Sequence, residues 1–167
     1  MKKTIIFLFL ISILFLNNLP EYKVTIPKDS IRFRIIANSN EEKDQLLKWD
    51  INKDLIPIIS KITKADSIYE SRNLIKNNIY EIESIVKNKT NDYSIKYGEN
   101  YFPTKKYNDV IYEAGNYESV VITLGAGAGD NWWCVLFPPL CLLEASQESY
   151  DELTYSFYIK DIIKKYS

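Results

Sequence analysis

Residues 118–139, ESVVITLGAGAGDNWWCVLFPP, decide the fold, because two apolar segments flank a loop of alternating glycines. Every second residue from Glu118 to Leu124 lies on one face of an extended chain, and that face is apolar after Glu118. The second segment, Trp132–Phe137, is apolar on both faces and is stopped by Pro138-Pro139. The pattern predicts a β-hairpin with a long glycine-rich loop over residues 125–131, GAGAGDN.

The chain upstream predicts one strand followed by two helices. Residues 31–38, IRFRIIAN, alternate apolar residues with Arg32 and Arg34, which is typical of a half-buried strand. Ser39 and Glu42 have capping-box spacing, so a helix is expected to begin there. Its apolar positions extend to Ile62, and Pro57 predicts a kink or a break one turn earlier. These positions are Leu46, Leu47, Ile51, Leu55, Ile58, Ile59 and Ile62.

The second helix follows Asp66-Ser67 and ends in the polar residues 87–92, with Ile68, Ile75, Ile79, Ile82 and Val86 at helical spacing. The period then changes to two over residues 93–97, and residues 110–112 form a short apolar segment. Residues 149–167 fit a helix or a strand. The predicted fold class is α+β, with a mixed or antiparallel sheet of four to five strands covered by two or three helices.

Length and composition limit the domain count and the chemistry. A chain of 167 residues with 46% hydrophobic and 26% charged residues fits one globular domain. Histidine is absent, which excludes Ser-His-Asp and Cys-His nucleophiles and imidazole zinc sites. The net charge of −1 gives no electrostatic reason to expect nucleic acid as a partner. No motif calls for a cofactor or a metal ion.

The N-terminus reads as an export signal. Lys2 and Lys3 precede residues 4–16, TIIFLFLISILFL, which as a helix would span about 20 Å, less than the roughly 30 Å core of a bilayer. Asn17, Asn18, Leu19 and Pro20 contain no small-x-small cleavage site, so a cleaved signal peptide and an uncleaved membrane anchor both stay open. We expect residues 1–20 to be the signal or anchor, 21–30 a tether, and 31–167 a single exported domain. Residues 21–167 carry 19 basic and 22 acidic side chains, a net charge of −3.

Three features of the sequence could carry chemistry. The GAGAGDN loop lacks the helix and the GK[ST] sequence of a phosphate loop, so a hairpin loop is the better interpretation. Cys134 and Cys141 lie seven residues apart, and their spacing leaves a disulfide and two buried thiols equally open. Glu113 and Glu118 could form a carboxylate pair of the glycosidase type, but no pattern fixes their separation.

Trp132 and Trp133 predict a partner-binding surface or a doubly covered strand. Adjacent side chains of a strand point to opposite faces, so both rings cannot enter one core. Either a second layer covers the strand, or one tryptophan contributes to a docking site of the kind that tryptophan favours. The glycine-rich loop would keep its backbone open for close approach. The partner-binding residues predicted on this basis are Trp132, Trp133, Gly125, Gly127, Gly129 and Asn131, with Arg34 and Asn38 on the neighbouring strand.

Three segments resemble the stage II sporulation protein R family of endospore-forming Firmicutes. They are residues 32–48 (RFRIIANSNEEKDQLLK), 101–107 (YFPTKKY) and 113–144 (EAGNYESVVITLGAGAGDNWWCVLFPPLCLLE). Two positions depart from the family pattern, Glu113 where proline is expected and Asp109 near the usual glycine.

The resemblance implies a secreted sporulation signalling protein and no enzyme. Such proteins are made in the forespore with a signal peptide and exported to the intermembrane space between forespore and mother cell. There they act by protease activation: a membrane-embedded aspartic peptidase is triggered and sigma-E processing follows. The alternative from the residues is an exported carboxylate-dependent hydrolase acting on cell-wall material.

Overall fold

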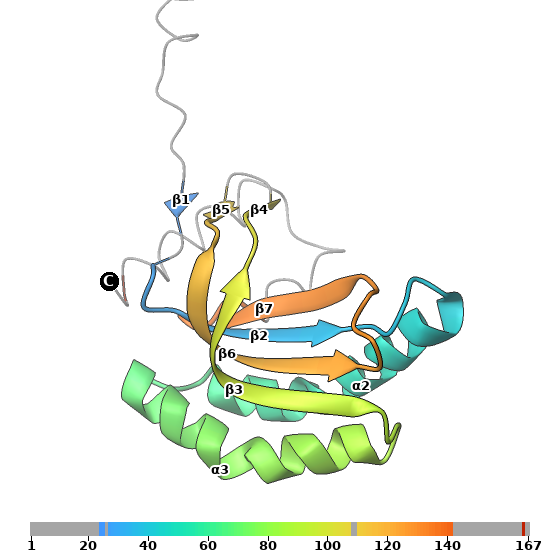
Figure 1. Cartoon of the computed structure of the whole chain (residues 1–167). Helices are drawn as coiled ribbons and strands as arrows, with labels where there is room; N and C mark the ends of the chain where they lie inside the picture. The colour runs from blue at the N-terminus through green and yellow to red at the C-terminus, as the bar shows by residue number, and fades with distance from the viewer. Residues whose placement is uncertain (1–23, 26, 108–109, 142–164, 166–167) are drawn as a thin grey trace, which may run out of the picture.

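The computed structural model describes residues 24–25, 27–107, 110–141 and 165. Its main sheet has four strands in the order β3-β6-β2-β7, where β2 is Ile31–Ile36, β3 Tyr93–Phe102, β6 Gly115–Leu124 and β7 Asn131–Phe137. Strand β2 pairs in parallel with β6 and antiparallel with β7, and β3 pairs antiparallel with β6. Helices α2 (Glu42–Ile62) and α3 (Ile68–Lys87) cover one face (Figure 1). The fold is α+β with a mixed sheet, as the sequence predicts.

A small second sheet lies on the side of the main sheet that faces away from the helices (Figure 1). It contains β1 (Val24–Thr25), β5 (Val110–Tyr112) and β4 (Lys105–Tyr107), in that order. Residues 24–25, expected to belong to a tether, therefore pair in parallel with β5. The signal or anchor at 1–20 and the C-terminal helix or strand at 149–164 lie outside the described residues. Within the described ranges, no helix is long and apolar enough to cross a membrane.

The predicted hairpin is wrong in its pairing. Strand β2 lies between β6 and β7, so the glycine-rich loop crosses the C-terminal end of β2 instead of joining neighbouring strands. Strand β7 is accordingly an edge strand and ends at Phe137, where the prolines begin. The sequence pattern correctly predicted that both segments are strands. Period-two alternation does not predict which strands pair with each other.

The two helices differ in how they begin. Helix α3 has Ser67 as N-cap, and its hydroxyl accepts a hydrogen bond from the Glu70 amide at 3.2 Å. Helix α2 begins at Glu42 with Glu41 as N-cap, so the predicted capping box of Ser39 and Glu42 is wrong. The Ser39 hydroxyl instead donates to the Asp44 carboxylate. Helix α2 also continues through Pro57 to Ile62 without a break.

The core lies between the helices and the main sheet. Phe33, Val120 and Cys134 share one face because they pair across β2, β6 and β7, and all three are buried. The helices contribute Ile51, Leu55, Ile58, Ile59, Ile62, Ile75, Ile82 and Val86. Leu46, expected on the apolar face of α2, is 60% exposed and does not belong to this core.

Candidate partner-binding surface

The crossing from β6 to β7 brings the glycine-rich loop against the residues that follow β2. Ala128 N donates to Asn38 O at 3.0 Å and Gly129 N donates to Ala37 O at 2.9 Å. We call residues 37–40, 125–130 and the first turn of α2 the loop cluster. Its position follows from the topology, since a chain that passes over the end of β2 must contact whatever leaves β2.

Asn38 holds the loop cluster together through both ends of its side-chain amide. Its Oδ1 accepts from Ala126 N at 2.9 Å, and its Nδ2 donates to Asp44 Oδ2 at 2.8 Å. Ser39 Oγ donates to the same carboxylate oxygen at 2.6 Å. The hydrogen bonds from Ser39 and Asn38 lower the pKa of Asp44 below its ordinary value. The ionised Asp44 therefore orients Asn38, and Asn38 orients the loop.

The glycines meet steric demands of this crossing. Gly125 and Gly127 have φ of +53° and +62°, a region that side chains rarely adopt. A Cβ at Gly125 would overlap the Asn38 side chain, and one at Gly129 would overlap the Ser39 carbonyl. The glycines let two backbones approach, while Ala126, Ala128 and Asp130 face solvent at the loop tip.

The start of α2 continues this surface. Lys48 is buried, donates to Gln45 Oε1 at 2.5 Å and Asp130 O at 3.1 Å, and places its ammonium 5.1 Å from the centre of the Trp49 ring. Burial lowers the pKa of Lys48. Trp49 is 51% exposed, and Leu46 and Ile56 lie on the same outward side of the helix. Trp49 is not among the predicted binding residues, although its place outside the apolar spacing of α2 indicates an exposed aromatic side chain.

The two tryptophans lie on opposite faces of β7, as alternation requires. Trp133 is 4% exposed and faces away from the helices, with its ring 4.5 Å from that of Tyr112 and 6.3 Å from that of Phe102. Trp132 is half-buried on the helix side, and its ring centre lies 6.1 Å from that of Phe33. Both faces of this strand are therefore covered, and Trp132 retains the larger accessible area.

Arg32, Arg34 and Asn131 lie on the face that carries Trp133. Arg34 is opposite Trp133 in the β2–β7 register, and with its amide oxygen turned toward Arg34, Asn131 accepts from Nε at 2.9 Å and Nη2 at 3.1 Å. Arg32 has no exposed surface, so the prediction of a half-buried strand is wrong at this residue. Four aromatic rings from other strands cover Arg32, and the alternating pattern of β2 could not predict them.

Cys134 and Cys141 form a disulfide. It joins β7 to the turn after Pro139, where Leu140 N also donates to Val135 O at 3.0 Å. In the part of the chain that is described, no three histidine, cysteine or acidic side chains converge as a metal site would require.

Of the two carboxylates named for the alternative hydrolase, Glu118 is held in an ion pair with Arg72 and Glu113 is exposed. The Glu118 carboxylate accepts hydrogen bonds from Arg72 Nε at 2.9 Å and from Tyr97 Oη at 2.7 Å. Burial raises the pKa of Glu118, but these hydrogen bonds and the Arg72 charge outweigh it, so the pKa is lower than usual. A general acid needs the opposite shift. Glu113 is exposed in the turn before β6 and contributes its backbone carbonyl to Tyr117 Oη.

Residues 27–147 match the family described as stage II sporulation protein R. The chain belongs to that family. A member from Bacillus subtilis (strain 168), named stage II sporulation protein R, is 44% identical over 133 residues, which cover 74% of this chain and 58% of that protein. The chain thus spans a little over half the length of this relative. No solved structure matches.

This membership gives the protein a role in sporulation, and the matched residues include the whole loop cluster. The family is named for sporulation and not for a catalysed reaction. Of the predicted binding residues, the structure brings Asn38, Gly125, Gly127 and Gly129 together in the loop cluster. It places Arg34, Asn131 and Trp133 on the face away from the helices, and Trp132 on the opposite side of β7.

Proposed function

We propose that this protein is an exported signal that activates the membrane-embedded aspartic peptidase which processes the sigma-E precursor. Exported from the forespore into the intermembrane space, it would couple forespore to mother-cell gene expression by binding, without catalysis of its own. Membership of the sporulation family carries this proposal.

The N-terminal sequence supports the route. Lys2 and Lys3 followed by the apolar residues 4–16 provide a signal for export, and the lysines would stay on the side where the protein is made. Residues after 20 would then face the space between the two membranes.

The described domain supports a binding role. Its loop cluster is fixed by side-chain hydrogen bonds, which pre-organise a surface and reduce the entropy lost on docking. The same loop exposes Ala126, Ala128 and Asp130, and Lys48, beside the exposed Trp49 ring, donates to the Asp130 carbonyl. Exposed aromatic area beside a rigid loop suits protein recognition.

The test co-produces the full chain, the peptidase and the sigma-E precursor in a bacterium that does not sporulate. We expect the precursor to be shortened only when all three are present and the peptidase retains its catalytic aspartate. A matched variant without residues 2–18 should fold but fail to trigger processing from the cytoplasm. Full processing by that cytoplasmic variant, or processing without the peptidase, would contradict the proposal.

A further inference from the structure

Two of the three arginines of this chain, Arg32 and Arg34, lie on the same face of β2, away from the helices. The third, Arg72, lies on α3 and forms an ion pair with Glu118, with Nη2 and Oε2 2.8 Å apart. One molecule therefore contains a guanidinium paired with a carboxylate, Arg72, and two guanidinium groups with no carboxylate partner among the described residues, Arg32 and Arg34.

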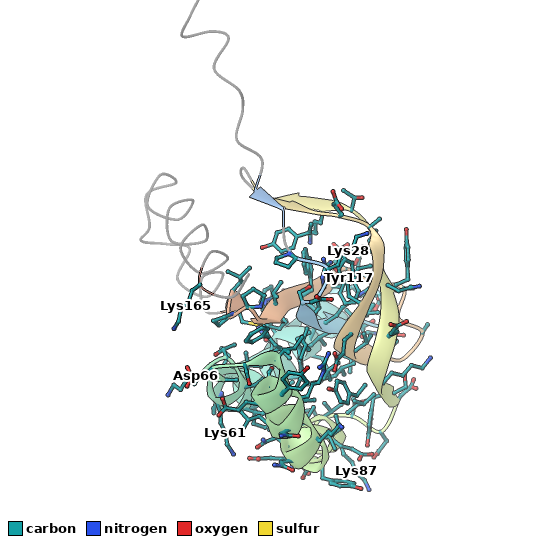
Figure 2. The ribbon with its side chains drawn as sticks, turned by 90° about the vertical axis from the view of Figure 1, so that its left-hand side faces the viewer. Lys28, Lys61, Asp66, Lys87, Tyr117 and Lys165 are labelled. Carbon is teal, nitrogen blue, oxygen red and sulfur yellow. A yellow bond between two sulfur atoms is a disulfide. The ribbon has the colours of Figure 1, made fainter. Side chains whose placement is uncertain are left out.

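Arg32 is enclosed by aromatic rings. Its guanidinium carbon lies 3.4 Å from the ring centre of Tyr117, a separation at which the planar group stacks on the ring. The same carbon is 5.2 Å from the centre of Phe102, 5.7 Å from Trp133 and 5.9 Å from Tyr112. Figure 2 shows Tyr117 on the side of the small sheet, away from the helix residues Lys61 and Lys87.

The N–H groups of Arg32 have no hydrogen-bond acceptor among the described residues. Nε, Nη1 and Nη2 are all buried and all without a partner within that part of the chain. Rings attract the charge through their faces, but they do not replace the in-plane acceptors that a guanidinium needs. Burial lowers the pKa of Arg32, and the neighbouring Tyr117 and Tyr112 offset only part of this effect.

Arg34 is the accessible neighbour of this group. It is half-buried, its Nη1 donates to Tyr101 O at 3.5 Å, and its guanidinium carbon lies 5.6 Å from the Phe102 ring centre. The Tyr101 carbonyl, the Phe102 ring and the Asn131 amide that contact Arg34 are all neutral groups. Two positive charges thus share one face with no carboxylate bound to either among the described residues.

We propose that Arg32 and Arg34 form a carboxylate-binding site that receives an acidic side chain from a polypeptide partner. This rests on the proposed function, since the partner would be the activated protein. A carboxylate is planar and matches the in-plane donors that remain when Tyr117 covers the guanidinium face. The net charge of −3 on residues 21–167 disfavours extended polyanions and anionic bilayers, which respond to long-range charge.

The structure also indicates how the ligand enters. Arg34 is reached first, because Arg32 has no accessible surface. One ring over Arg32, that of Tyr112, belongs to β5, and the strands of the small sheet pair only with one another within the described chain. The rings of Phe102, Tyr117 and Trp133 belong to the main sheet, so Tyr112 is the ring over Arg32 that can move without a change in the main sheet.

The binding test titrates the full chain, in mild detergent, with a capped hexapeptide of alternating glutamate and glycine, and with its glutamine counterpart. We expect saturable binding of the glutamate peptide only, weakened about tenfold or more by Arg34→Met and by Arg32→Met. Arg72→Met is the matched control and should bind as the parent does. Equal binding of both peptides, unchanged binding by both variants at Arg32 and Arg34, or full competition by inorganic phosphate or phosphatidylglycerol vesicles would overturn the proposal.

The melting temperature separates a binding role from a structural one. Replacing a buried charge that lacks a counter-ion by a similar apolar side chain leaves stability equal or higher, so Arg32→Met should melt at or above the parent, whereas Arg72→Met should melt lower because Glu118 loses its partner. If Arg32→Met melts well below the parent, Arg32 is structural. A second test asks whether Arg32 binds a carboxylate of the chain itself. Four of the acids after residue 141 are neutralised in the parent and in Arg32→Met. A lower melting temperature in the parent only would show such an internal partner and would overturn the proposal. These acids are Glu144, Glu148, Asp151 and Glu152.

Sigma-E processing keeps this inference distinct from the proposed function. If the parent binds the peptide but neither it nor any variant triggers processing, the carboxylate site is supported and the proposed signalling function is wrong. Processing by the parent without any peptide binding would do the reverse.

Discussion

The two faces of the main sheet bury charge in different ways. On the helix side Glu118 is half-buried and is paired with Arg72 and Tyr97, and the surrounding core is mainly aliphatic. On the other face Arg32 is buried under aromatic rings, with no carboxylate among the described residues. A satisfied pair is what folding requires, whereas an unsatisfied buried group is the kind of local conflict that accompanies function. The Arg72–Glu118 pair on the helix side is therefore a stabilising contact, whereas the unpaired Arg32 on the opposite face is a candidate for function.

The largest effect is expected at the tryptophans, which sample the two faces from adjacent positions. Trp133 is 4% exposed, so Trp133→Ala should lower the free energy of unfolding by ~3–5 kcal/mol, and Trp132→Ala, at a half-buried site, by roughly half as much. Urea denaturation followed by circular dichroism measures both. Equal losses would show that the two faces contribute alike.

Measuring sigma-E processing separates the roles of Trp132 and Trp133 further. If Trp132 contributes to docking, Trp132→Ala should keep its fold and lose sigma-E processing. Normal processing by a folded Trp132→Ala protein would move the docking surface away from this strand, toward the loop cluster or Trp49.

The disulfide should have the next largest effect, because it fastens the end of β7 to the following turn. Closing a loop of about eight residues restricts the unfolded chain by roughly 2–3 kcal/mol, so the double change Cys134→Ala and Cys141→Ala should lower stability by about that amount. Thermal melting of the double variant and of the parent with reductant should agree. Unequal melting would indicate that packing of the two side chains matters apart from the bond.

Much of the fold could be predicted from sequence, because local period reports local environment. The alternation over 93–97 and 118–124 and the helical spacing up to Val86 each predicted an element that the structure contains. The insertion of β2 between β6 and β7 could not be predicted, since register across a parallel pair depends on contacts far apart in the chain. The burial of Arg32 depends on rings from four other strands and has no signature in its own segment.

The partner-binding residues stay a prediction, but the structure shows how four of them are arranged. Gly125, Gly127, Gly129 and Asn38 were predicted to contact a partner, and in the structure Asn38 fixes the loop while Gly125 and Gly129 allow its close approach to residues 38 and 39. Pre-organisation and contact are separate roles, and the residues exposed at the loop tip are Ala126, Ala128 and Asp130. A sequence pattern alone could not divide the two roles, because both favour glycine.

Glycine substitutions in the loop cluster should have a smaller effect. Gly129→Ala would place a Cβ against the Ser39 carbonyl, which must shift, so we expect a loss of about 1–3 kcal/mol. Ala128→Ser, at an exposed neighbouring position, is the matched control and should change stability by less than about 0.5 kcal/mol. Chemical denaturation of the three proteins decides, and equal stability of all three would show that the crossing has room to relax.

The smallest effect concerns acid and the Asp44 carboxylate. Ser39 and Asn38 lower its pKa below the ordinary 3.8, so its contribution is fully present above that value and is lost as the pH falls through the folded-state pKa. Once protonated, Asp44 accepts the two hydrogen bonds less well, Asn38 is released, and the Ala126 amide loses its fixed acceptor. In ¹⁵N-resolved spectra, the Ala126 signal should therefore move between about pH 5 and pH 2. Asp44→Asn should abolish this movement, whereas Glu118→Gln, a change on the helix side of the sheet, should leave it in place. If the Ala126 amide signal still moves with pH in Asp44→Asn, another acid controls the conformation of the loop. The proposed link from Asp44 through Asn38 to the glycine-rich loop would then be wrong.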